Sequence, residues 1–157
     1  MQRYFIELSY NGSGYHGWQI QPNALSVQEE IESKLSRLYS NAPIKVVGCG
    51  RTDTGVHAHH YMLHVDLPFI SDTEQFCVKL NRMLPSSIAI AHVYPVSEDQ
   101  HARFSATSRT YRYFIHSKKD PFRSESSWYL NQNLDVAKMN EASKFLIGKQ
   151  DFTSLAK

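Results

Sequence analysis

The stretch "IKVVGCGRTDTGVHAHHYMLHVDL", residues 44–67, places two apolar runs on either side of a polar loop. The runs, 44–49 and 61–67, are rich in β-branched and other large apolar residues, a composition that is typical of strands. Between them lie two glycines, three histidines, Arg51 and Asp53, far more than a tight turn requires. The stretch therefore predicts two consecutive strands joined by a loop that is expected to be functional.

Two further segments repeat apolar residues at helical spacing. In "SVQEEIESKLSRLY", residues 26–39, Ser26 and Glu29 form a capping box at the start of the apolar repeat. In "TEQFCVKLNRML", residues 73–84, the repeat ends at Pro85, which cannot continue a helix. Both segments are predicted to be helices with one apolar face.

The remaining apolar segments complete the fold. Residues 3–10 and 87–96 alternate as strands do, so the order is β-α-β-β-α-β. This order predicts an α+β fold of the ferredoxin-like (RRM-like) type, an antiparallel sheet with helices on one face. An additional strand over 108–117 and a helix over 135–148, with Asp135 as its N-cap, are predicted to follow.

Composition limits the classes of protein that remain. The chain has 157 residues, is 41% hydrophobic and has a formal charge of +2, which permits a polyanionic partner without requiring one. Its two cysteines lack the spacing of a zinc ribbon or a disulfide framework, which favours a reducing cytoplasm. No segment approaches the roughly 18 consecutive apolar residues of a membrane span.

Arg51 and Asp53 have two interpretations. In the first, the loop is a structural turn in which Asp53 caps a backbone group and Arg51 pairs with it or faces solvent. In the second, the glycines allow a close approach to another molecule, and Thr52 and Thr54 hold Asp53 in a fixed pose. A carboxylate can act as a nucleophile or stabilise an oxocarbenium-like centre, so chemistry at a glycosidic bond is open to Asp53.

The histidines near this loop raise the question of a metal. Imidazole is the commonest zinc ligand, and His57, His59, His60 and His64 lie close together in the sequence. Strand alternation, however, places His57 and His59 on one face and His60 on the other, and neither cysteine joins them at a ligand spacing. Histidines that pack or face solvent at a strand entrance are the simpler interpretation, and no metal site is predicted.

Residues 100–123 combine basic and aromatic side chains. Against a single acid, Asp120, they contain six basic residues: Arg103, Arg109, Arg112, Lys118, Lys119 and Arg123. Basic side chains contact phosphates and aromatic rings stack on unpaired bases, so the segment suits single-stranded or looped RNA. An edge strand with a solvated basic face explains the same composition. Within the predicted strand, Arg109 and Tyr111 share one face.

The run "GRTDTGVHA", residues 50–58, resembles the signature of the tRNA pseudouridine synthase I family, in which such a run carries the catalytic aspartate. Four further segments resemble that family in the same order: "YNGSGYHGWQIQP", "SVQEEIESKL", "HARFSATSRTYRYFI" and "DFTSLAK". The resemblance implies a cytoplasmic homodimer that isomerises uridine to pseudouridine in the anticodon stem-loop of tRNA. It implies no cofactor and no metal.

The resemblance also assigns roles to single residues. Asp53 matches the nucleophile, whose target, C1′ of the ribose or C6 of the base, stays open. Tyr111 matches a tyrosine that stacks against the target base and takes a proton from C5, and Arg51 matches an arginine that helps to displace the target nucleotide. The residues expected to contact tRNA are Arg103, Arg109, Arg112, Lys118, Lys119 and His57.

Proteins of this family continue with a second domain that completes the central sheet and supplies a basic residue to pair with the aspartate. The resemblance therefore divides the chain into a ferredoxin-like domain, residues 1–105, and the start of the second catalytic domain, residues 106–157. Because the sequence stops at Lys157, we expect the chain alone to have little or no synthase activity.

Two functions of other classes stay open. One is a non-catalytic RNA-binding module of ferredoxin-like shape, although the strands lack an evident RNP-type motif. The other is a metal-dependent hydrolase that uses His57, His59 and His60, for which the purified protein would carry stoichiometric zinc.

Overall fold

The computed structural model describes residues 1–148 and 151–153. The chain forms two compact units: unit 1 comprises Met1–Thr110, and unit 2 begins at Tyr111. None of the helices in the described residues has the length and hydropathy that a membrane span requires.

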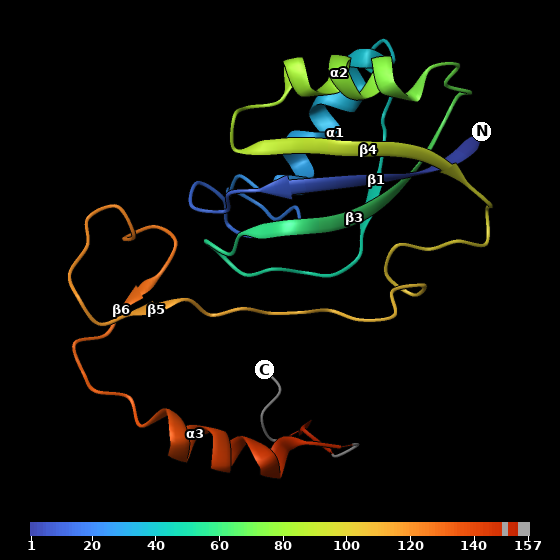
Figure 1. Ribbon diagram of the computed structural model, residues 1–157. Coiled ribbons are helices and arrows are strands. Elements are labelled where there is room, and N and C mark those ends of the chain that lie inside the picture. The colour runs from blue at the N-terminus through green and yellow to red at the C-terminus, as the bar shows by residue number, and fades with distance from the viewer. Residues whose placement is uncertain (149–150, 154–157) are drawn as a thin grey trace. The chain divides into compact units, whose positions relative to one another are not determined.

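Unit 1 has the element order β-α-β-β-α-β (Figure 1). Its elements are β1 (Gln2–Tyr10), α1 (Val27–Leu38), β2 (Val46–Gly48), β3 (Ala58–Leu67), α2 (Thr73–Met83) and β4 (Ile88–Val96). The strands form one antiparallel sheet in the order β2-β3-β1-β4, with both helices on one face. The predicted combination of an antiparallel sheet with helices is confirmed.

The core lies between the sheet and the two helices. Alternate residues of β1 point into it and are at most 4% exposed: Tyr4, Ile6, Leu8 and Tyr10. The helices meet them with side chains that are fully buried: Val27, Ile31 and Leu35 of α1 and Leu80 of α2. Burial of each large apolar side chain contributes roughly 1.5–3 kcal/mol. The apolar faces of β1 and of the two helices therefore supply much of the stabilisation of unit 1.

Side chains also fix where the helices begin. The Ser26 hydroxyl accepts a hydrogen bond from the Glu29 N–H (3.2 Å), and the Asp72 carboxylate accepts one from the Gln75 N–H (2.8 Å). Each of these bonds satisfies a backbone donor that the first helical turn leaves without a partner. The second helix ends at Met83, ahead of Pro85 as the sequence predicts.

The strand boundaries next to the polar loop differ from the prediction. β2 is shorter than the predicted 44–49, because the ladder between β2 and β3 runs only from Val46 opposite Val65 to Gly48 opposite Leu63. β3 begins earlier than the predicted 61, because Ala58 still pairs with Tyr10 of β1.

Buried Glu32 ties α1 to β2. Its Oε1 accepts hydrogen bonds from the Val46 N–H (2.9 Å) and from the Gln28 amide (3.0 Å), and its Oε2 lies 3.2 Å from Lys45 Nζ. Because the Lys45 side chain is mostly exposed, this ion pair adds little stability. The important contact is therefore the hydrogen bond to the Val46 N–H.

Replacement of Glu32 by Ala is expected to lower the free energy of unfolding by about 1–3 kcal/mol, because the Val46 N–H loses its acceptor inside the protein. Glu32→Gln retains an acceptor oxygen and is expected to cost clearly less. Urea unfolding of the two variants measures the difference. Equal losses in both would contradict the view that the hydrogen bond outweighs the charge.

A side chain of α2 bonds to one residue of β4, a strand at the edge of the sheet. The Ile90 N–H donates to Asn81 Oδ1 (2.8 Å), and the Ile90 carbonyl accepts from Asn81 Nδ2 (2.8 Å). The amide of Asn81 thus pairs with Ile90 as a neighbouring strand does.

Residues 98–105 cover part of the sheet face opposite the helices. Arg3 pairs with Asp66 (2.8 Å) and donates to the carbonyls of this segment, and the Ala102 N–H donates to Nδ1 of buried His64 (3.1 Å). Burial, assisted by the charge of Arg3, lowers the pKa of His64 to about 4. The neutral imidazole is therefore the form that accepts the hydrogen bond.

This arrangement predicts that stability decreases at acidic pH. The unfolded chain protonates His64 below about pH 6.5, whereas the folded protein takes up that proton only near pH 4. The free energy of unfolding is therefore expected to fall as pH decreases from about 6.5 to 4 and to level off below that range with respect to His64.

Urea unfolding at a series of pH values tests this dependence. His64→Gln is expected to reduce the slope between pH 6.5 and 4 by one proton, whereas His92→Gln, at an exposed position of β4, serves as the control. The same slope in the wild type and both variants would contradict the assignment.

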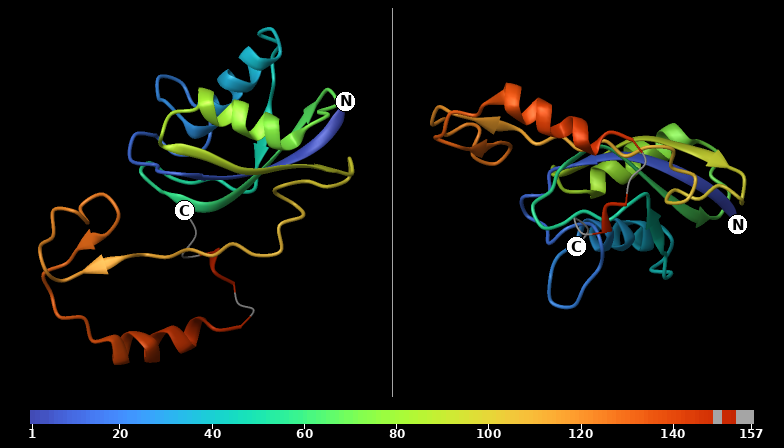
Figure 2. Two further views of the ribbon diagram at one scale, coloured as in Figure 1. Left: turned by 45° about the horizontal axis from the view of Figure 1, so that its top comes forward. Right: turned by 90° about the horizontal axis from the view of Figure 1, so that it is seen from below.

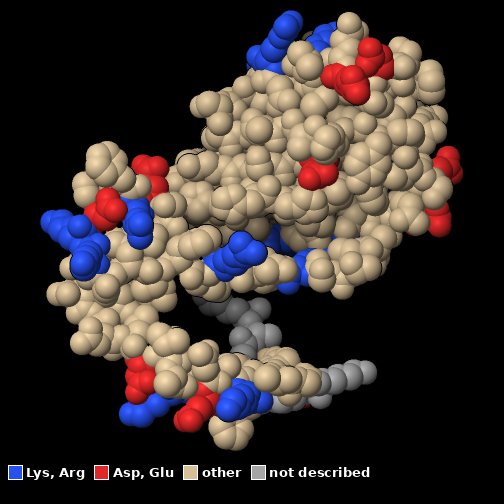
Figure 3. Space-filling view, in the orientation of Figure 1, with Lys and Arg blue, Asp and Glu red and all other residues tan. Residues whose placement is uncertain are grey.

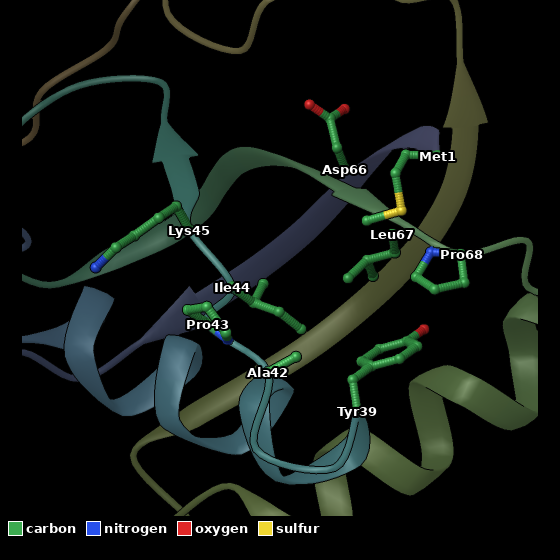
Figure 4. Close-up of a pocket in the computed structure, with 9 residues that line it drawn as sticks. All are labelled: Met1, Tyr39, Ala42, Pro43, Ile44, Lys45, Asp66, Leu67 and Pro68. Carbon is green, nitrogen blue, oxygen red and sulfur yellow. The ribbon is translucent and has the colours of Figure 1, made fainter.

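A hollow of about 340 Å³ lies at the end of β3 that is away from the polar loop (Figure 4). Its lining is mostly apolar, and Asp66, its acidic residue, is already paired with Arg3. The residues that line it are Met1, Tyr39, Ala42, Pro43, Ile44, Lys45, Asp66, Leu67 and Pro68.

In unit 2, the strand predicted over 108–117 is wrong for most of its length. Only β5 (Ile115–His116) is a strand, and it pairs in parallel with β6 (Trp128–Tyr129). Residues 108–114 pair with no strand in the part of the chain that the structure describes, and Tyr113 is 90% exposed. The backbone groups of a strand need hydrogen-bond partners on a neighbouring strand, and an alternating sequence alone does not supply that neighbour.

The predicted helix over 135–148 is confirmed, with a tighter turn at its end. α3 spans Val136–Ser143 and continues as a 3₁₀ helix over Lys144–Leu146. Asp135 caps it by accepting a hydrogen bond from the Lys138 N–H (3.0 Å), and Gly148 follows with a φ of +103°. The closing motif "DFTSLAK" lies partly outside the described residues.

Candidate active site

The loop between β2 and β3, residues 49–57, is here called the site loop. It lies at one end of the sheet beside residues 11–18, the support loop, which follows β1 (Figure 2). Three hydrogen bonds join the two loops: from the Trp18 N–H to the Thr52 carbonyl (3.2 Å), from the Gly55 N–H to the Tyr15 carbonyl (3.2 Å), and from the Gly12 N–H to His57 Nδ1 (3.1 Å). The backbone around Asp53 is thus held at several points.

Three buried aromatic rings form the floor beneath the site loop. Trp18 packs against Tyr61 with ring centroids 4.3 Å apart, and Tyr10 lies 6.2 Å from Trp18 and 5.5 Å from Tyr61. The Tyr61 hydroxyl donates to the Gly50 carbonyl, and the Tyr10 hydroxyl pairs with Thr52 Oγ1 (2.9 Å). Burial raises the pKa of Tyr61 well above its usual range, so its hydroxyl stays protonated and can donate.

Glycines allow these close approaches. A Cβ on Gly12 would lie 2.0 Å from the Val56 carbonyl oxygen, and one on Gly17 would lie 2.2 Å from that of Thr52. Gly17 also has a φ of +87°, a conformation that other residues rarely adopt. The support loop therefore fits against the site loop only with glycine at both positions.

Asp53 lies at the exposed tip of the site loop. Its carbonyl accepts the Val56 N–H (3.2 Å), which closes a turn, but its carboxylate makes no hydrogen bond or ion pair with any residue that the structure describes. The same holds for the guanidinium of exposed Arg51 across residues 1–148 and 151–153, so these two side chains do not pair with each other there. Among the described residues, Asp53 therefore does not cap a backbone group as the turn interpretation expects, although exposed Arg51 agrees with it, and the carboxylate is available to another molecule.

The histidines serve separate purposes. His57 accepts from Gly12 and precedes β3, whereas His59 and His60 lie within β3, where His60 is 3.1 Å from Glu7. His64 belongs to the other end of the strand. No group of three or more potential metal ligands is gathered in the described part of the chain.

The predicted tRNA contacts fall in both units. Arg103 is exposed near the Phe104 ring (6.0 Å), and Arg109 donates to backbone carbonyls of unit 1. Tyr111, Arg112, Lys118 and Lys119 are exposed residues of unit 2. Figure 3 shows basic and acidic side chains mixed on the segment that joins β5 to β6, where Arg123 pairs with Asp120 (3.3 Å).

Comparison with known proteins gives consistent results. A protein named tRNA pseudouridine synthase A from Parabacteroides distasonis is 50% identical over 158 residues, which cover all of this chain. Proteins of the same name from Bacteroides thetaiotaomicron and Listeria monocytogenes are 46% and 41% identical over 100% and 98% of the chain. The chain is a homologue of tRNA pseudouridine synthase A.

The resemblance that the motifs indicate is thus confirmed. The chain spans 62%, 58% and 63% of the lengths of these three relatives. A comparison with models of protein families found no match.

The sequence reasoning missed the residues that support the site loop. Tyr10 and Tyr61 occupy inward positions of their strands and are indistinguishable there from ordinary core residues. Gly12 and Gly17 gave a weak signal, because they belong to a group of three glycines within residues 12–17, in a segment that also resembles tRNA pseudouridine synthases.

Gly17→Ala is expected to lower the free energy of unfolding by about 1–3 kcal/mol, through a disfavoured φ and a clash with the Thr52 carbonyl. Gly14→Ala is the matched control in the same loop, since its Cβ would meet no atom within 4 Å, and it is expected to change stability by less than about 1 kcal/mol. Urea unfolding measures both effects. Equal stabilities of the two variants would show that the loops are not packed as described.

Proposed function

We propose that this chain is part of a tRNA pseudouridine synthase that isomerises uridine in the anticodon stem-loop, with Asp53 as the nucleophile. The observation that carries the proposal is the carboxylate of Asp53, which is exposed and unpaired among the described residues on a backbone held by the support loop. Homologues named tRNA pseudouridine synthase A support the reaction and the tRNA substrate.

The reaction replaces the bond between N1 and C1′ of uridine with a bond between C5 and C1′. An unpaired carboxylate can attack C1′, which releases the base, or C6, which activates the ring. Either route needs a nucleophile in a fixed position, because misplacement by about 1 Å can cost roughly 100-fold in rate. The hydrogen bonds on both sides of Asp53 support this requirement, because they hold the backbone that carries the carboxylate.

The target uridine must leave its stack before Asp53 can reach it, which costs a few kcal/mol. We assign Arg51 to displacement of the nucleotide and Tyr111 to stacking on the flipped base and to removal of the proton from C5. Stacking on an aromatic ring is worth about 1–3 kcal/mol per base and offsets much of this cost.

Phosphate contacts supply the remaining affinity. Exposed Lys and Arg side chains that make no ion pair within the described residues suit this role best, because each can neutralise a phosphate. The residues of this kind proposed to contact tRNA are Arg103, Arg109, Arg112, Lys118 and Lys119. Half-buried His57, which accepts from the Gly12 N–H, is proposed as a further tRNA contact.

We further propose that residues 1–105 form a ferredoxin-like (RRM-like) domain and that residues 106–157 begin a second catalytic domain of a cytoplasmic homodimer. The element order and the strand order β2-β3-β1-β4 support the first part. Exposed aromatic side chains in unit 2, such as Tyr113, Phe122 and Trp128, support the second, because a complete domain buries most such groups. No cofactor is assigned to the reaction.

The test is the variant Asp53→Asn in the product of the complete reading frame that encodes this chain. Pseudouridine formation is expected to fall at least about 1,000-fold, as for the loss of a nucleophile elsewhere, while tRNA affinity stays within about twofold. Asp99→Asn, at an exposed turn, is the control. Retained turnover in Asp53→Asn would contradict the assignment.

The same assay separates the proposal from a non-catalytic RNA-binding module. Such a module binds tRNA but forms no pseudouridine in the wild type. The 157-residue chain assayed alone, by release of tritium from C5-labelled tRNA, tests the expectation that it has little activity by itself.

A further inference from the structure

The side chain of Arg109 lies against the first residues of the site loop. Its Nε and Nη2 both donate to the Cys49 carbonyl (3.0 and 2.7 Å), and Nη2 also donates to the Arg103 carbonyl (2.8 Å). Its Nε lies 3.4 Å from the position that a Cβ on Gly50 would occupy. The guanidinium therefore passes directly beside the backbone that leads to Asp53.

These contacts use three of the five N–H donors of the guanidinium. The Cys49 peptide is held from the other side as well, because its N–H donates to the Met62 carbonyl (2.8 Å) on β3. The start of the site loop is thus fixed between the sheet and Arg109. A lysine does not reproduce this geometry, because its ammonium lacks the planar fork with which Nε and Nη2 meet the Cys49 carbonyl together.

The place of Arg109 in the chain adds a second consequence. By bonding to Cys49 and Arg103 together, it holds residues 103–109 against the base of the site loop. Tyr111 follows two residues later, at the start of unit 2. The last residues of unit 1 are therefore held, through Arg109, to the loop that carries Asp53.

We propose that Arg109 is a positioning residue for the reaction, in addition to any phosphate that it contacts. It acts through the backbone: it sets the base of the loop that carries Asp53 and the origin of the segment that carries Tyr111. This inference rests on the proposed function, and it gives Arg109 a role that the charge of an exposed arginine alone does not predict.

The variants Arg109→Lys and Arg109→Ala in the product of the complete reading frame test the proposal, with Arg82→Ala on α2 as the control for loss of a charge. Both Arg109 variants are expected to lower kcat at least about tenfold; the Kd for tRNA changes less than about twofold in Arg109→Lys, which keeps the charge, and rises in Arg109→Ala, which also loses the phosphate contact. If Arg109 acts only as a phosphate contact, Arg109→Lys stays active and Arg109→Ala weakens binding and its salt dependence, which overturns the proposal.

Amide hydrogen exchange of the 157-residue chain gives a readout that does not depend on catalysis. In Arg109→Lys, the Gly55 and Val56 amides, which donate to Tyr15 and Asp53, are expected to exchange several-fold faster than in the wild type. Unchanged exchange at both amides would overturn the positioning role. Absence of pseudouridine formation in the wild type would refute the proposed function, and the exchange result would still decide the role of Arg109.

Discussion

The mutual packing of Trp18, Tyr10 and Tyr61 is the contact on which the rest of the site depends. The indole comes from the support loop, and the two phenols come from neighbouring strands of the sheet, so one cluster joins an irregular segment to the most regular part of the fold. Both phenol hydroxyls then reach upward to the site loop. In aromatic clusters of this kind, the preferred ring geometry contributes to stability beyond the burial of apolar area.

Stability and reactivity are separated within a few residues. Apart from Arg109 and His57, the groups that hold the site loop are mostly buried rings or backbone atoms, whereas Arg51 and Asp53 project from it into solvent. A substitution at either exposed side chain is therefore expected to have little effect on packing. A substitution in the floor has the opposite character, because it moves the backbone on which both side chains stand.

The sequence predicts most of unit 1, because its signals are local. Strand alternation, the cap at Ser26 and the stop at Pro85 each depend on a few neighbouring residues, and the structure agrees with them. The prediction of a strand over 108–117 is wrong for most of its length, because strand formation depends on a partner that is distant in the sequence.

The candidate site follows the same division. The glycines, Arg51 and Asp53 mark the loop as unusual in the sequence itself. The contacts of Arg109 cannot be seen in the sequence, because their acceptors are main-chain carbonyls. Every residue has such a carbonyl, and no sequence pattern marks the ones that are bonded. Only folding shows which carbonyl a guanidinium meets.

The pairing of Asn81 with Ile90 has a consequence for how the sheet can grow. An edge strand with unpaired backbone groups is a template on which other chains add, and soluble proteins guard against this. With the amide of Asn81 occupying the place of a neighbour, the N–H and the carbonyl of Ile90 are not available to an incoming strand. A single helical side chain thus interrupts the row of backbone groups that β4 presents at the edge of the sheet.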